Sequence, residues 1–539
     1  MRANLDRLSA STVSVLFSFK AFQALLLMLT CLAACLFVAQ ALRFLPVTGE
    51  NMYPESAGVL SALNWAHGIP LYQDYRLPPH LVTSFPPLWY AFLAIPVKFG
   101  LPDMDSLTLF GRILSLIFLV GTVALTYAWN RRIGFSLPTA LVSPAFYLSF
   151  PILIPWAVTA RPDFPALFFS FFAIYWAATR SRPAWICLAG IAASLAFLIR
   201  HNAVAAPIAI VLWLLSSRKW KHSLLFCAVW LLTVAGTLVP IHMSTDGLLL
   251  LNLSGAKFGF LAVTYVRDVW QRLLSTEGYG FALMLFAFGA FGFVESCKKA
   301  DQRTRLLTLY LVVSLGLAVV GSAAAGGGVN HYLEPALAMA ALVPFALSRL
   351  QKDWNKESPL ASFAIVFSLI FLLPSLDVRR WEFMHNRPEN LKDVVPLVQG
   401  KEVFTDIPYL AARTPTPESI DLASLINAER VGGWAGWSSK NLAQSLRARK
   451  YDVVILSRPV EKTAVPDGRY PRAPRFDSDI RAAIWDNYRF CFELGTVELD
   501  KTYVYGPTSP GPSATAATCP SWENAASKRL STESPRAAN

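Results

Sequence analysis

Long apolar segments recur along the first 377 residues of this chain, and short loops rich in lysine and arginine separate them. A bilayer core requires about 20 apolar residues of helix to cross it. Charged residues make up only 15% of the sequence, against about 25% in soluble domains. The pattern therefore predicts a polytopic α-helical membrane protein. Its first segment, 13–45, is too long for a cleaved signal peptide and is expected to be retained as an anchor.

The length of each apolar segment predicts about eleven transmembrane helices. They are expected near residues 15–45, 106–129, 138–157, 164–179, 184–199, 203–216, 223–243, 278–295, 306–323, 333–349 and 359–376. The apolar segment 86–99 is shorter and contains Pro86, Pro87 and Pro96. It predicts a helix that lies on the membrane or dips into it.

Basic residues cluster after every second predicted span, as at Arg131–Arg132 and Lys298–Lys299, whereas the intervening loops contain few. The positive-inside rule places these clusters in the cytoplasm. By alternation, the loop 46–105, named here the first loop, and the chain after Asp377 face outward. A net charge of +13 is compatible with nucleic-acid binding. Because the charges punctuate apolar segments, they instead favour membrane topology and contact with anionic lipid, with no nucleic-acid partner.

Three domains follow from this organisation. Residues 1–377 form the predicted transmembrane domain, 378–506 a small soluble extracytoplasmic α/β domain, and 507–539 a disordered tail rich in Ser, Pro, Ala and Thr. Short buried strands are expected at 401–406 and 451–457. Cys491 and Cys519 can pair if this part of the chain is extracytoplasmic. The predicted location is a bacterial cytoplasmic (inner) membrane.

The first loop carries two carboxylates, Glu50 and Glu55, just beyond the end of the first span. Residues 57–67 then repeat apolar side chains at helical spacing in a piece too short to cross a bilayer, which predicts an amphipathic helix in the loop. A loop this polar, held to the membrane at both ends, is typical of an enzyme that works at the membrane surface. A capping or dipole role for Glu55 is the plain alternative, because this residue follows Pro54 at a helix start.

Other outward turns also place ionisable or polar residues at the membrane boundary, where such residues are costly and often functional. The candidate substrate-binding residues are Asp74, Arg161, Asp163, Arg200, His201, Asn330, His331, Tyr332 and Glu334. Structural alternatives remain open: a plain ion pair between Arg161 and Asp163, or a lipid-phosphate contact for Arg200.

Taken together, these groups fit one kind of chemistry. A carboxylate at the interface can deprotonate an acceptor hydroxyl as a general base. Arginines beside it can hold the phosphate of a leaving group, because guanidinium matches phosphate bidentately. The adjacent bilayer can hold a lipid tail. This combination predicts sugar transfer from a polyprenyl-phosphate donor.

At these residues the chain resembles the type-C (GT-C) membrane glycosyltransferases, in particular bacterial dolichyl-phosphate-mannose-mannosyltransferase-like and aminoarabinose-transferase-like proteins. The resemblance covers the layout of 1–377. It rests on the acidic first loop and on Gly68-Ile-Pro-Leu-Tyr-Gln-Asp74, Pro86-Pro87-Leu88, Arg161-Pro-Asp163, Arg200-His201-Asn202 and Asn330-His-Tyr-Leu-Glu-Pro335. Family members often carry an Asp-Glu pair in the first loop, where this chain has separated Glu50 and Glu55, and many carry Lys-Gln where it has Arg200-His201.

The resemblance implies an inverting transferase that uses an undecaprenyl-phosphate-linked sugar and an acceptor glycan, lipid or protein outside the cytoplasmic membrane. It implies that a first-loop acid is the base. It favours Glu55, whose distance from Gly68 fits the family better, with Glu50 as the alternative. Members differ in their use of a divalent metal ion, so no metal is assigned.

Two other functions compete with this prediction. A transporter or flippase for lipid-linked saccharides would favour paired repeats and charges near the bilayer midplane, whereas the ionisable residues here gather at one face. A polymerase or ligase would share the lipid-linked substrate but place its site in a large late loop. The corresponding loop here, 324–332, is short.

Overall fold

The structure is a computed structural model of the whole chain. It describes residues 18–47, 49, 51, 55–77, 80–101, 103–150, 153–179, 182–255, 267, 270, 279–298, 301–323, 328–354, 391, 394–414, 438–457, 460, 478–494 and 502–508.

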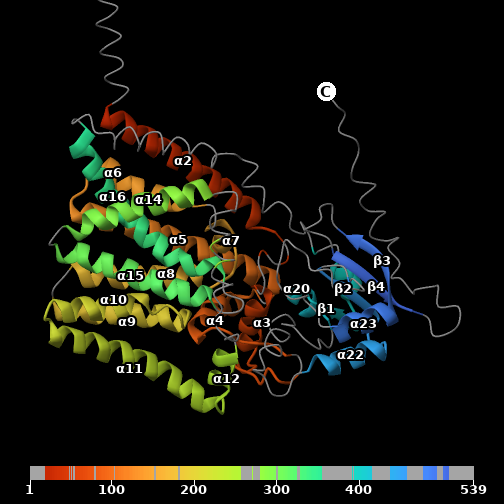
Figure 1. The fold of residues 1–539 in the computed structure, drawn as a ribbon. Coiled ribbons are helices and arrows are strands. Elements are labelled where there is room, and N and C mark those ends of the chain that lie inside the picture. Colours follow the sequence, from red (N-terminus) through yellow and green to blue (C-terminus); the bar gives the residue numbers. More distant parts are fainter. Residues whose placement is uncertain are drawn as a thin grey trace, which may run out of the picture.

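Apolar helices packed side by side form the larger part of the molecule (Figure 1). In chain order they are α2 (Phe19–Phe44), α5 (Met104–Ile133), α6 (Leu137–Leu148), α7 (Leu153–Ala157), α8 (Asp163–Thr179), α9 (Pro183–Ile199), α10 (Ala205–Ser216), α11 (Trp220–Ser244), α14 (Tyr279–Cys297), α15 (Gln302–Ser322) and α16 (Leu333–Trp354). Five segments among the described residues are long and apolar enough to cross a bilayer, and six apolar helices are shorter. The chain is a multi-pass membrane protein.

The span predicted over 138–157 is wrong as a single helix. Helix α6 ends at Leu148 and α7 begins at Leu153. The physical reason is proline, since Pro151 disfavours helical backbone at the residue before it. The span predicted at 359–376 lies outside the described residues, and the number of spans stays a prediction.

Among its described residues, the first loop contains three short helices: α3 (Glu55–Ala66), α4 (Pro87–Ala94) and the 3-10 helix η1 (Ile95–Phe99). Helix α3 covers most of the segment 57–67 that was predicted to be helical. It is followed by Gly68, whose φ of +87° turns the chain.

Helix α12 (Leu248–Gly255), which is far from the first loop in sequence, is hydrogen-bonded to it. Its buried Asn252 accepts a hydrogen bond from the Thr83 backbone N–H at 3.0 Å and donates one to the Gln73 carbonyl at 2.8 Å. One side chain therefore ties two points of the loop to the helix that follows α11.

The tail domain, meaning the described residues from Leu391 to Thr508, contains a four-stranded sheet. Its strands are β1 (Val403–Thr405), β2 (Val453–Leu456), β3 (Tyr488–Leu494) and β4 (Thr502–Pro507), in the order β1-β2-β4-β3, with β1 and β2 parallel and the other pairs antiparallel. Its helices are α19 (Val395–Val398), α20 (Pro408–Ala411), α22 (Ser439–Arg447) and α23 (Ser478–Asn487). Strands β1 and β2 lie inside the two predicted segments.

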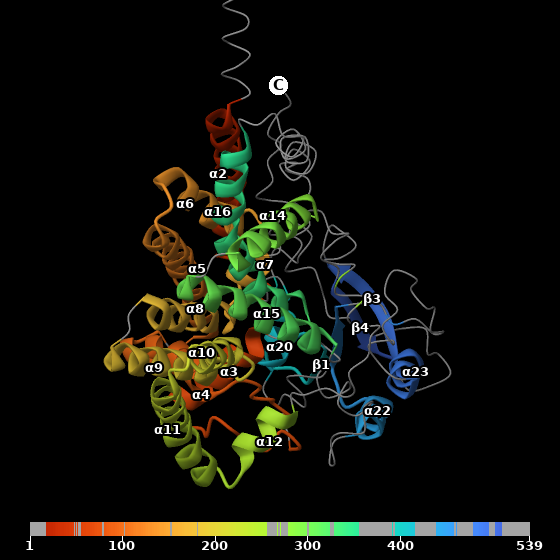
Figure 2. The same ribbon diagram turned by 60° about the vertical axis from the view of Figure 1, so that its left-hand side comes forward.

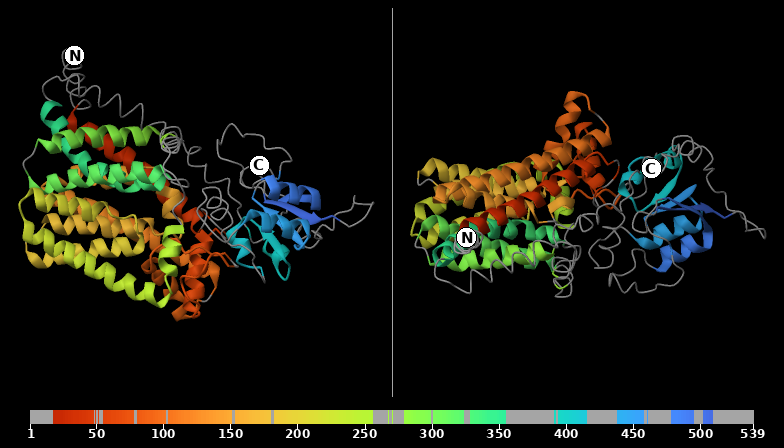
Figure 3. Two further views of the ribbon diagram at one scale, coloured as in Figure 1. Left: turned by 60° about the horizontal axis from the view of Figure 1, so that its bottom comes forward. Right: turned by 90° about the horizontal axis from the view of Figure 1, so that it is seen from above.

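The sheet separates two apolar cores. On one face, Leu442, Leu446 and Ile484 of α22 and α23 pack against Val454, on the side of the sheet away from the helical bundle (Figure 2). On the other face, the tail domain joins the core of the first loop, where Ile407, Leu410 and Val453 share one cluster with Val59, Ala62 and Tyr72. Figure 3 shows the tail domain next to the first-loop segment at one end of the bundle.

Cys491 on β3 is disulfide-bonded, and its partner lies outside the described residues. The predicted pairing with Cys519 therefore stays a prediction. The described thiols of Cys31, Cys35, Cys187, Cys227 and Cys297 are free.

Helices α14 and α16 approach closely because two glycines of α14 face α16. A Cβ added at Gly289 would lie 2.7 Å from the Met339 Cβ, and one added at Gly292 would collide with the Leu342 carbonyl oxygen. We expect Gly292→Ala to force the helices apart and to lower the free energy of unfolding by about 1–3 kcal/mol, measured by thermal or denaturant unfolding in detergent.

Gly316 in α15 provides the matched control, since a Cβ there meets nothing within 4 Å. Gly316→Ala should be neutral or slightly stabilising. Equal destabilisation by the two substitutions would contradict a steric role for Gly292.

Candidate functional site

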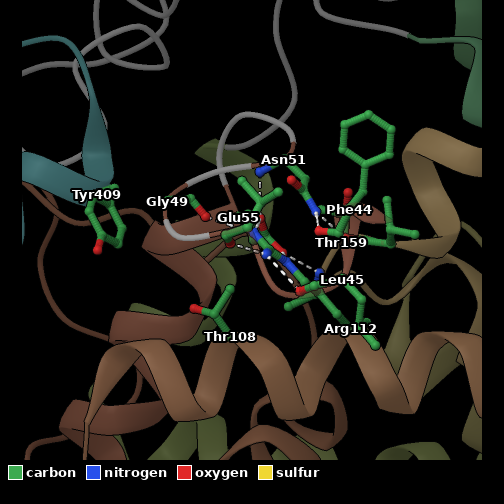
Figure 4. A network of polar contacts seen from close by, with 12 residues as sticks. Phe44, Leu45, Gly49, Asn51, Glu55, Thr108, Arg112, Thr159 and Tyr409 are labelled. Carbon is green, nitrogen blue, oxygen red and sulfur yellow. Dashed lines mark hydrogen bonds and ion pairs between the residues drawn. The ribbon is translucent and has the colours of Figure 1, made fainter. Parts of the chain in front are cut away.

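A buried ion pair joins the first loop to the bundle. Glu55 is the first residue of α3, and Arg112 lies in α5. The arginine Nε donates to Glu55 Oε1 at 2.8 Å and its Nη2 donates to Oε2 at 2.7 Å, so the contact is bidentate. The two side chains are 0% and 1% exposed. Figure 4 shows the pair at the centre of a polar network.

The Glu55 carboxylate accepts two further hydrogen bonds from backbone N–H groups. Ala160 donates to Oε1 at 2.6 Å and Asn51 donates to Oε2 at 2.9 Å. Each carboxylate oxygen therefore accepts two hydrogen bonds, which accounts for about four lone-pair sites. As arranged, Glu55 has no lone pair left to accept a proton from a substrate.

The Arg112 guanidinium also holds the chain between α2 and α3. Its Nη1 donates to the carbonyl of Val47 at 2.5 Å and to that of Leu45 at 3.2 Å, and its Nη2 donates to the carbonyl of Gly49 at 2.7 Å. Backbone carbonyls close to the first span are thus fixed by one buried cation.

Glu50, the other predicted first-loop acid, lies outside the described residues. Its two neighbours in the chain do not. The Gly49 carbonyl is held by Arg112 and the Asn51 amide by Glu55. The ion pair therefore fixes the backbone on both sides of Glu50.

A second polar cluster forms around Asp163, the first residue of α8. Its carboxylate accepts hydrogen bonds from Arg161 Nε at 3.2 Å and Asn330 Nδ2 at 2.9 Å, and it forms an ion pair with Arg200 Nη1 at 2.9 Å. The aspartate side chain is 1% exposed, and those of Arg161 and Arg200 are 13% and 14% exposed. The structure thus brings together four predicted site residues from three separate turns.

The two clusters share one turn of the chain. Ala160, which donates to Glu55, directly precedes Arg161. Ser115 of α5 fixes this turn by donating to the carbonyls of Thr159 at 2.9 Å and Arg161 at 3.2 Å. The predicted convergence of a first-loop carboxylate with the arginine turn is therefore present.

Helices α8 and α9 form a hairpin that positions Arg200. Both helices are 17 residues long, and Arg200 is the residue that caps the end of α9. At the opposite end of the hairpin, the rings of Trp176 and Trp185 stack with centroids 4.4 Å apart. The hairpin therefore returns the chain to the level of Asp163.

The predicted site residues nearest the C-terminus lie beside this cluster. Asn330, His331 and Tyr332 lie in the 3-10 helix η2 (Val329–Tyr332), which leads into α16. Glu334 is the second residue of α16 and accepts a hydrogen bond from the Tyr310 hydroxyl at 2.7 Å.

Aromatic rings pack around the same cluster. The Tyr332 hydroxyl is 3.2 Å from the Ser322 hydroxyl. The Arg161 guanidinium lies 4.9 Å from the ring centroid of Trp156 and 5.8 Å from that of Phe85, within the range of cation–π attraction.

Among the described contacts, Asp74 joins neither cluster. It accepts hydrogen bonds from Arg76 at 2.6 and 2.7 Å on the exposed part of the first loop. The Arg76 guanidinium lowers the pKa of the Asp74 carboxyl. His201, next to Arg200, is half-buried.

Sequence reasoning missed the role of Arg112. An arginine within an apolar helix is a signal in itself, because a buried guanidinium needs a carboxylate partner. Asn51 was also missed. Besides its amide contact with Glu55, it donates through Nδ2 to the carbonyls of Val158 at 2.6 Å and Phe44 at 3.1 Å.

Within the part of the chain that the structure describes, no group of three or more His, Cys, Asp or Glu side chains is arranged to hold a metal ion. Glu50 lies outside the described residues, and metal use stays unassigned.

Comparison with known proteins agrees with the resemblance found in the sequence. Residues 86–243 match the model of the dolichyl-phosphate-mannose-protein mannosyltransferase family. No curated protein matches the chain.

Solved structures share the fold. The crystal structure of ArnT from Cupriavidus metallidurans bound to undecaprenyl phosphate aligns with a TM-score of 0.55 at 10% identity, over 87% of this chain and 97% of that chain. Its apo form gives the same values. The oligosaccharyltransferase AglB from Archaeoglobus fulgidus, in complex with an inhibitory peptide and a dolichol-phosphate, aligns with a TM-score of 0.48 at 13% identity, over 89% and 74% of the two chains. The resemblance to type-C membrane glycosyltransferases is confirmed at the level of fold.

The buried ion pair predicts a large loss of stability when one partner is removed. Arg112→Met leaves the Glu55 carboxylate buried without its cation, and we expect the free energy of unfolding to fall by about 3–5 kcal/mol. Thermal unfolding in detergent would measure it.

The exposed pair of Arg76 and Asp74, with side chains 43% and 23% exposed, provides the control. Arg76→Gln should change the free energy of unfolding by about 1 kcal/mol or less. A similarly small effect of Arg112→Met would contradict the structural role of the buried pair.

Proposed function

We propose that this chain is an inverting membrane glycosyltransferase, which moves a sugar from a polyprenyl-phosphate-linked donor to an acceptor glycan, lipid or protein on the outer side of the cytoplasmic membrane. The observation that carries the proposal is the pair of partly exposed guanidinium groups at Asp163. One of them belongs to Arg161, which directly follows Ala160, the residue whose amide binds Glu55. The mannosyltransferase family match over 86–243 and the fold shared with ArnT bound to undecaprenyl phosphate support it.

Arg161 and Arg200 are proposed to hold the donor phosphate. Two guanidinium groups face the single carboxylate of Asp163, and both side chains are partly exposed. The Glu55–Arg112 pair, by contrast, is almost completely buried. Guanidinium groups bind the phosphate of a leaving lipid through charge-assisted hydrogen bonds. Asp163 would orient both arginines.

Glu50 is proposed as the general base, with Glu55 as the residue that positions it. The sequence favoured Glu55, but all four acceptor positions of that carboxylate are occupied by Arg112, Ala160 and Asn51. A base needs a free lone pair within hydrogen-bond reach of the acceptor proton. The proposal therefore assigns the base to the other first-loop acid, Glu50, whose neighbours Gly49 and Asn51 are held by the ion pair.

The proposed reaction balances with these groups alone. The acceptor hydroxyl gives its proton to the Glu50 carboxylate while its oxygen bonds to the anomeric carbon. The bond from that carbon to the phosphate oxygen breaks, and the lipid phosphate leaves with the electron pair towards Arg161 and Arg200. Attack from the face opposite the leaving group inverts the anomeric configuration.

The proposed outward side of the site has independent support. Basic clusters recur on the opposite side of the predicted spans. The tail domain contains a disulfide-bonded Cys491, and disulfides persist mainly in oxidising compartments.

Substitution of the proposed base tests the mechanism. Glu50→Gln should lower kcat for sugar transfer by about 10²–10⁴-fold and leave the unfolding temperature unchanged. Glu55→Gln should lower both activity and unfolding temperature, because it weakens the pairing with Arg112. Transfer from a purified polyprenyl-phosphate sugar, followed by mass spectrometry, measures the rate.

Three outcomes would count against this assignment. Full activity of Glu50→Gln with a stable but inactive Glu55→Gln would assign the base to Glu55. Full activity of both variants would discard carboxylate catalysis by the first loop. Absence of transfer by the wild-type protein with any polyprenyl-phosphate sugar would discard the proposed function.

Substitution of Arg200 tests the phosphate site. Arg200→Gln removes one of the two cations, and we expect the KM for the lipid donor to rise about 10- to 100-fold, with a much smaller change for the acceptor. Arg200→Lys keeps the charge and should lose less. Arg349→Gln, on the exposed side of α16 where Arg349 pairs with Asp353, is the control and should have no effect. Equal changes in both KM values would contradict the phosphate role.

A further inference from the structure

The tail domain contacts the turn that flanks Glu50. A Cβ added at Gly49 would lie 2.9 Å from the Leu391 Cδ1, so the leucine packs directly on the glycine. Gly49 has a φ of +106°, a left-handed conformation that favours glycine. Its carbonyl accepts the hydrogen bond from Arg112. Leu391 and Arg112 therefore hold the same residue by different atoms.

A second contact lies at the start of α5, in the same helix as Arg112. The Tyr409 hydroxyl donates to Asp105 Oδ1 at 3.1 Å, and Arg413 Nη2 donates to the same oxygen at 2.8 Å. The Arg413 guanidinium lies 3.7 Å from the centroid of the Tyr409 ring. Tyr409 is 2% exposed, and Figure 4 places it at the edge of the Glu55 network.

A third contact is apolar and reaches α3 itself. Ala411 of α20 shares a buried cluster with Ala57 and Leu81 of the first loop. Ala57 lies one helical turn or less from Glu55. Helix α20 therefore touches both helices that carry the buried ion pair.

We propose that Leu391 and the segment Tyr409–Arg413 form a clamp, which fixes the turn containing Gly49, Asn51 and Glu55 and makes the tail domain a working part of the transfer site. Leu391, Tyr409 and Arg413 are positioning residues: they act through Gly49 and α5 rather than on a substrate. The inference rests on the proposed function for its catalytic consequence and on geometry alone for the clamp itself.

Such a clamp would matter for catalysis because it would hold the base in position. A base must stand within hydrogen-bond reach of its proton, and a displacement of about 1 Å can lower a rate about 10²-fold. From the bundle side, the turn is held by Arg112 and Glu55. From the other side, Leu391 covers Gly49. Loss of the leucine would free one face of the turn without breaking the ion pair.

The test combines hydrogen–deuterium exchange with kinetics on the full-length protein. In Leu391→Ala we expect faster amide exchange over 46–66 and a kcat lowered about tenfold or more, with the KM for the lipid donor within about twofold of the wild type. Leu442→Ala is the matched control, since Leu442 is buried in the tail-domain core on the far face of the sheet. It should alter neither the exchange over 46–66 nor kcat.

A charge exchange tests the second contact. Asp105→Arg and Arg413→Asp should each speed exchange over 46–66 and lower kcat, and the double variant should recover most of both. If the single variants acted only by destabilising the tail domain, the double variant would not recover exchange or kcat.

Two results would overturn the clamp. One is unchanged exchange over 46–66 in Leu391→Ala. The other is an equal effect of Leu442→Ala on exchange and kcat. Because exchange is measured without any substrate, a wild-type protein that transfers no sugar would refute the proposed function, while the exchange data would still decide the clamp.

Discussion

The ion pair between Glu55 and Arg112 is the interaction on which the first loop depends. Both charges are removed from water, a step that costs several kcal/mol per ion and is offset only when geometry and hydrogen bonding are nearly complete. Here the pairing is bidentate, and backbone amides and carbonyls from both neighbouring turns complete it. One pair of side chains thereby joins the end of α2, the start of α3, helix α5 of the bundle and the turn before α8.

This arrangement separates two tasks that the sequence alone does not distinguish. The buried pair at Glu55 organises backbone, whereas the two arginines at Asp163 are still partly exposed. Complete burial suits a structural anchor, and partial exposure suits a group that must meet a ligand. The two clusters are adjacent because Ala160 and Arg161 are consecutive residues.

Much of this organisation is predictable from the sequence. Apolar segments of bilayer length identify the helical membrane fold. The polar residues at the outward ends of those segments identify the cluster of Arg161, Asp163, Arg200 and Asn330. The partnership of Glu55 with Arg112 is not predictable in the same way, because the residues are 57 positions apart and no local spacing links them. Strands β3 and β4 were not predicted either, since their pairing depends on contacts made only after the chain folds.

The equal arms of the α8–α9 hairpin have an evolutionary consequence. Each helix has 17 residues, and the stacked tryptophans at the far end fix how the arms align. Insertion of one amino acid into either arm would shift Arg200 along the axis by about 1.5 Å and swing it around the helix by about 100°. Relatives that keep the ion pair between this arginine and Asp163 should therefore conserve the length of the hairpin more strictly than its side chains, with gaps confined to the connection between the arms.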